Sequence, residues 1–135
     1  MTAKEKNLGQ IDESYIKKGA GKISDEDIRR VSEKADEIEE KFKSAGPLKR
    51  FMEDLRLLIA IVKDYWSGEY REIPYMSIAA IVFALLYVLS PMDIIPDVIP
   101  VVGYLDDAAV VAICLRLVEE DLYEYKEWKE KRAVA

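Results

Sequence analysis

The sequence of 135 residues carries a net charge of −6 and contains one Cys and no His. The length suits one domain, and the missing His leaves no candidates for Ser-His or Cys-His catalysis or for ordinary zinc sites. Because acidic residues outnumber basic ones by 26 to 20, we expect no nucleic-acid partner.

Residues 1–23 are charged throughout and lack the apolar core and cleavage site of a secretory signal. They predict a mobile N-terminal arm, followed by a single helical domain over residues 24–135. The expected location is cytoplasmic, and peripheral attachment to the cytoplasmic membrane and insertion into it are both open.

Residues 24–45 show the pattern of an amphipathic helix. Ser24 and Asp27 have the spacing of a capping box. The apolar residues that follow alternate at spacings of three and four: Ile28, Val31, Ala35, Ile38, Phe42 and Ala45. A narrow stripe of this kind suits a partner helix, so self-association through Ile28 to Ala45 is one expected interaction.

A second helix with a wide apolar face is predicted over residues 48–66, between Gly46-Pro47 and Ser67-Gly68. The uncharged run that follows predicts a third helix, Tyr75 to Leu89. This helix would be about 22 Å long, against about 30 Å for the hydrocarbon core of a bilayer. It could span only a thinned membrane.

A fourth, long helix is predicted from Tyr104 to about Lys131, apolar in its first half. Cys114 lies in that apolar half and is interpreted as a small buried hydrophobe. The predicted fold is therefore all-α, a small bundle of about four main helices with a short helical or turn segment between the third and fourth.

That connecting segment is rich in proline and acid. Asp93, Asp97, Asp106 and Asp107 are the only charges between Ile73 and Leu115. They are predicted to cap the adjoining helices, as aspartates at helix N-termini do. One alternative is a site for a hard cation, Mg²⁺, Mn²⁺ or Ca²⁺, built from these four carboxylates. Another is a carboxylate pair for acid–base chemistry.

Arg116 is a charge within an otherwise apolar stretch. If it is buried it needs a partner, and we predict an ion pair with Asp93 or Asp97. The alternative is that its methylene stem carries the charge out to solvent.

A basic cluster lies at the first turn between helices: Lys41, Lys43, Lys49 and Arg50. Such a cluster adds roughly 1 kcal/mol of attraction to an anionic leaflet per charge. A solvated helix end explains it equally well.

The segment from Tyr87 to Asp107 resembles the YkvA family, which is built on a domain of unknown function. An apolar helix leads into a Ser-Pro-x-Asp-x-x-Pro-Asp turn, and Asp-Asp opens another apolar helix, all at unbroken spacing. The resemblance covers roughly residues 55–118. Its signature positions here are Asp93, Pro96, Asp97, Gly103, Asp106 and Asp107, and the structural positions of the turn also include Ser90, Pro91 and Pro100.

The resemblance implies a compact helical fold and frequent prediction as membrane-associated, with no assigned reaction, cofactor or partner. We expect a non-enzymatic helical module at the cytoplasmic membrane, with an apolar hairpin around the acidic turn and a lipid or membrane protein as partner. The alternative is a divalent-cation-binding protein, hydrolytic in one version, that uses the aspartates of the turn.

Overall fold

The computed structural model describes residues 14, 16–44, 46–89 and 107–134, and these residues are mainly helical. The elements are α2 (Asp25–Glu33), α3 (Ala35–Ser44), the 3₁₀ helix η1 (Gly46–Phe51), α4 (Met52–Ser67), α5 (Tyr75–Leu89), α7 (Asp107–Leu117) and α8 (Glu119–Val134). No strand occurs in these ranges, so the all-α prediction is confirmed. The segment between α5 and α7 lies outside the described residues.

Two of the predicted helices are each divided in two. The first is interrupted at Lys34, between α2 and α3, and the last at Val118, between α7 and α8. Backbone hydrogen bonds continue across both interruptions, with Ile38 donating to Lys34 and Leu122 donating to Val118. The chain therefore changes direction without leaving its polar backbone groups unsatisfied.

The α2–α3 segment begins with the predicted capping box, in which the backbone N–H of Ser24 donates to the Asp27 carboxylate at 3.0 Å. Its apolar stripe faces inward, and Ile28, Val31, Ile38 and Phe42 have no exposed surface. Both helices pack against α4 and α5. The described part of the stripe that suggested self-association, from Ile28 to Phe42, is thus covered by the chain's own helices.

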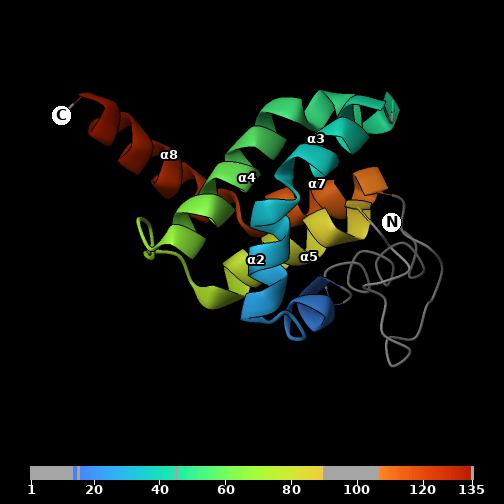
Figure 1. Ribbon diagram of the computed structural model, residues 1–135, viewed down its shortest axis with the longest axis horizontal. Coiled ribbons are helices and arrows are strands. Elements are labelled where there is room, and N and C mark those ends of the chain that lie inside the picture. The colour runs from blue at the N-terminus through green and yellow to red at the C-terminus, as the bar shows by residue number, and fades with distance from the viewer. Residues whose placement is uncertain (1–13, 15, 45, 90–106, 135) are drawn as a thin grey trace, which may run out of the picture.

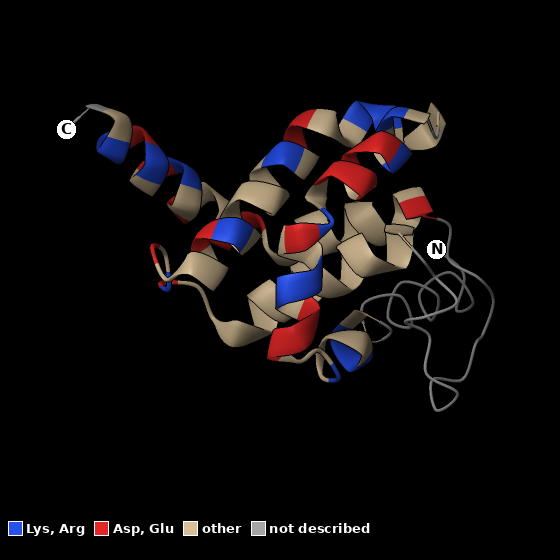
Figure 2. Cartoon of the chain, in the orientation of Figure 1, with Lys and Arg blue, Asp and Glu red and all other residues tan. Residues whose placement is uncertain are grey.

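Helix α5 is the centre of the bundle (Figure 1). It has the predicted bounds, and every residue from Ile78 to Val88 is buried. Neighbours α2, α3, α4 and α7 all contact it, and no charge lies on it (Figure 2). Among the described residues, no helix is long and apolar enough to cross a bilayer.

Part of the predicted N-terminal arm packs on this core. Residues 16–20 form a helical turn, and Ile16, Ala20 and Ile23 are buried. A Cβ added to Gly19 would overlap the Phe83 ring, so only glycine allows this approach to α5. Three apolar residues, dispersed among the charges of the predicted arm, therefore belong to the core.

Candidate functional site

The acidic turn identified in the sequence is described only where it meets α7. Asp107 is the first residue of that helix and is partly buried, where a carboxylate is favoured by the exposed N–H groups and the helix dipole. The other positions of the motif lie outside the described residues: Asp93, Asp97, Asp106, Ser90, Pro91, Pro96, Pro100 and Gly103. Within the described ranges, no three acidic or thiol side chains gather as metal ligands. The cation site stays a prediction.

The two apolar helices that flank the motif, α5 and α7, pack against each other. Beside the start of α7, where α7 and η1 contact each other, lies a cavity of about 590 Å³. Residues of both elements line the cavity: Gly46, Pro47, Leu48 and Arg50 from η1, and Asp107, Ala108, Ala109 and Ala112 from α7. Small alanine side chains on α7 leave this space open.

The end of the bundle next to this cavity is basic. Lys43, Lys49 and Arg50 are exposed and Lys41 is partly exposed. The Arg50 guanidinium lies 4.7 Å from the centre of the Phe51 ring. None of the four cations forms an ion pair with a described residue, whereas Arg29 and Arg30 on α2 do. This end of α3 and η1, which we call the basic end, therefore presents four cations that form no ion pair with a described residue, and acids of α3 and α4 lie on either side of it (Figure 2).

Arg116 is exposed, so its charge is not buried. The predicted ion pair rested on burial, and that premise is wrong, because Arg116 shares the outer face of α7 with Ala112, four residues earlier and also exposed. The structure agrees with the alternative in which the stem carries the charge to solvent. The proposed partners, Asp93 and Asp97, lie outside the described residues.

Cys114 occupies the inner face of α7 and is fully buried. Its thiol lies 3.6 Å from the carbonyl oxygen of Ala80 on α5, which it can reach as a donor. Burial raises the pKa of the Cys114 thiol to about 12. The thiol is therefore protonated at neutral pH and acts as a small core residue, as predicted.

Sequence reasoning missed the polar contacts that attach α8 to the bundle. The hydroxyl of Tyr125 donates to Asp64 on α4 at 2.5 Å, and Ser77 on α5 donates to Asp121 at 2.5 Å. Burial, with the nearby Asp64 carboxylate, raises the pKa of Tyr125 above its usual range. These partners are 61 and 44 residues apart, so no local pattern indicates them.

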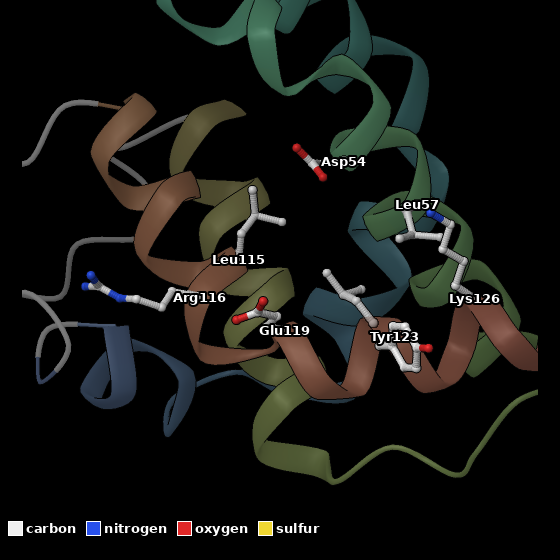
Figure 3. Close-up of a pocket in the computed structure, with 8 residues that line it drawn as sticks. Asp54, Leu57, Leu115, Arg116, Glu119, Tyr123 and Lys126 are labelled. Atoms are coloured by element: carbon white, nitrogen blue, oxygen red, sulfur yellow. The ribbon is translucent and has the colours of Figure 1, made fainter.

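A second hollow lies between α4, α7 and α8 (Figure 3). This groove of about 360 Å³ has an apolar floor of Leu57, Leu115 and Leu122, beside Tyr123. Four charged residues also line it: Asp54, Arg116, Glu119 and Lys126. The groove therefore combines an apolar centre with a rim of two acids and two bases.

Comparison with known proteins agrees with the motif. The family described as protein of unknown function (DUF1232) matches residues 77–113, which include most of α5 and most of α7. The chain is 31% identical over 81 residues to the uncharacterized membrane protein YkvA of Bacillus subtilis (strain 168). That alignment covers 60% of this chain and 76% of the relative. No solved structure matches the chain. The chain belongs to the YkvA-like family built on the domain of unknown function DUF1232.

Proposed function

We propose that this protein is a non-enzymatic helical module that binds the cytoplasmic surface of an anionic membrane through its basic end. The observation that carries the proposal is the charge of that end: Lys41, Lys43, Lys49 and Arg50 lie within ten residues that contain no acid, in a chain whose net charge is −6. The relative from Bacillus subtilis is called a membrane protein, which supports the same assignment.

The packing of the bundle favours surface binding over insertion of the α5–α7 hairpin. Helix α5 is enclosed by four other helices, so exposing it to lipid would first require the bundle to open. The basic end needs no such opening, because its cations already face solvent. Each cation contributes roughly 1 kcal/mol to the free energy of binding to an anionic membrane, so four cations contribute about 4 kcal/mol. This corresponds to an increase in affinity of about a thousandfold.

Vesicle co-sedimentation tests this proposal. The wild-type chain should sediment with phosphatidylglycerol-containing vesicles and not with pure phosphatidylcholine vesicles, and added salt should release it. The variant with Lys41, Lys43, Lys49 and Arg50 all replaced by Gln should lose most of the binding.

A matched control replaces four other exposed cations by Gln: Lys17, Lys18, Lys63 and Lys131. Both variants have the same net charge, so only the position of the removed charge differs. Equal loss in the two variants, or binding that persists on uncharged vesicles, would contradict the assignment of the basic end.

A further inference from the structure

The exposed face of α8 carries a regular pattern that the core does not use. Glu119, Tyr123, Lys126 and Glu130 follow one another at spacings of four, three and four residues, which places them along one side of this helix. All four are exposed, and Tyr123 is 65% exposed, more than any other large hydrophobic residue described. We call this series the α8 stripe.

The charges around Tyr123 are self-complementary. Glu119 and Lys126 lie on either side of Tyr123, four residues before it and three after it, and carry opposite charges. Reversing the direction of the helix exchanges these two positions. A second, antiparallel copy would therefore set Glu119 opposite Lys126 of that copy, with the two Tyr123 side chains at the centre.

The surroundings of the stripe suit such a pairing. None of its four side chains forms a hydrogen bond or ion pair with another described residue, whereas those of Asp121 and Tyr125 on the inner face of α8 do. Glu119, Tyr123 and Lys126 lie along the α8 side of the groove (Figure 3). The apolar floor of the groove beside Tyr123 offers room for an aromatic ring from the second copy.

We propose that two copies of this chain associate through the α8 stripe, as antiparallel helices centred on Tyr123, with each tyrosine seated at the other copy's groove. This interface lies on different elements from the basic end, so it does not depend on membrane binding. Because a single helix pair buries a small area, the association is weak and reversible.

Sedimentation equilibrium of the full chain, from about 10 μM to 1 mM, tests the proposal. The average mass should rise from 15.5 kDa toward twice that value. Tyr123→Asp should raise the dissociation constant by about tenfold or more, because it removes the aromatic side chain at the centre of the interface. The control is Met76→Asp, at another exposed apolar residue (53% exposed), which should leave the constant unchanged. Circular dichroism verifies that both variants fold.

A charge exchange tests the antiparallel arrangement. Lys126→Glu and Glu119→Lys each place like charges opposite one another in a dimer of identical copies, so each variant alone should associate more weakly than wild type. An equimolar mixture of the two should associate again, because each charge then meets its opposite. Glu40→Lys, a charge reversal at an exposed acid on α3, is the control and should associate as tightly as wild type.

Three results would overturn the proposal. A mass of one chain at every concentration would leave the groove to an occupant of different chemistry. Self-association that Tyr123→Asp does not weaken would place the interface elsewhere. Failure of the charge-exchanged mixture to associate more tightly than its components would rule out the antiparallel pairing.

Discussion

The bundle centre and helix α8 are held in place by different interactions. From Ile78 to Val88, helix α5 is buried and carries no charge, so burial of apolar surface supplies the stability. Helix α8 buries few side chains and depends on Tyr125, which bonds to Asp64, and on the aromatic contacts of Tyr70 with Tyr125 and Trp128. Substitutions at the centre should therefore cost more free energy of unfolding than substitutions at α8.

Phe83→Ala should produce the largest effect. The Phe83 ring is fully buried on α5, so its loss leaves a cavity at the centre of the bundle. We expect the free energy of unfolding to fall by about 3–5 kcal/mol, measured by urea denaturation. Met76→Ala, at an exposed position on the same helix, should change it by less than about 0.5 kcal/mol. Equal costs at the two positions would refute the central role of α5.

Gly19→Ala tests whether residues 16–23 belong to the core. The added methyl group would overlap the Phe83 ring, so we expect a loss of about 1–3 kcal/mol from overpacking. Gly46→Ala is the control, because a Cβ there meets nothing within 4 Å. If both glycines tolerate the methyl group equally, residues 16–23 do not pack on α5 in solution.

The sequence predicted the central elements well because their signals are local. The capping box at Ser24 and the bounds of α5 follow from neighbouring residues, and the α2–α3 stripe follows from helical periodicity. The exposure of Arg116 was harder to predict from the sequence. The outward face of α7 also carries Ala112, so this face is not marked by a run of polar residues. The contact of Gly19 with Phe83 and the bond between Tyr125 and Asp64 join distant parts of the chain, so only the fold reveals them.

Tyr125→Phe tests the attachment of α8. Removing the hydroxyl leaves the Asp64 carboxylate without this donor, although Lys129 lies 3.8 Å away, and we expect a loss of about 1–2 kcal/mol at neutral pH. Retention of full stability at neutral pH would show that aromatic packing alone holds α8.

The same tyrosine predicts a pH dependence. Because the pKa of Tyr125 is raised in the folded chain, protonated Tyr125 favours the folded state. This contribution to stability is complete below about pH 10, the pKa of tyrosine in the unfolded chain, and it is lost as the pH rises through the higher pKa of the folded state. Wild type should lose stability more steeply above pH 10 than Tyr125→Phe in denaturant titrations. The phenylalanine variant retains Tyr70, Tyr75 and Cys114, whose pKa values are also raised by burial, so a smaller decline should remain. Parallel pH profiles for the two proteins would contradict the raised pKa of Tyr125.

Asp107→Ala should have the smallest effect, and it separates the two interpretations of the acidic turn. As a helix cap, Asp107 contributes about 0.3–1 kcal/mol at the start of α7, and its loss should cost the same with or without divalent cations. As a cation ligand, it would couple stability to cation concentration. Then millimolar Mg²⁺, Mn²⁺ or Ca²⁺ would raise the melting temperature of wild type and not of the variant. Capping is the expected outcome, because Asp107 is the first residue of α7, where the exposed N–H groups and the helix dipole favour a carboxylate. A cation-dependent shift confined to wild type would overturn this expectation and extend the role of α7 from a wall of the bundle to part of a binding site.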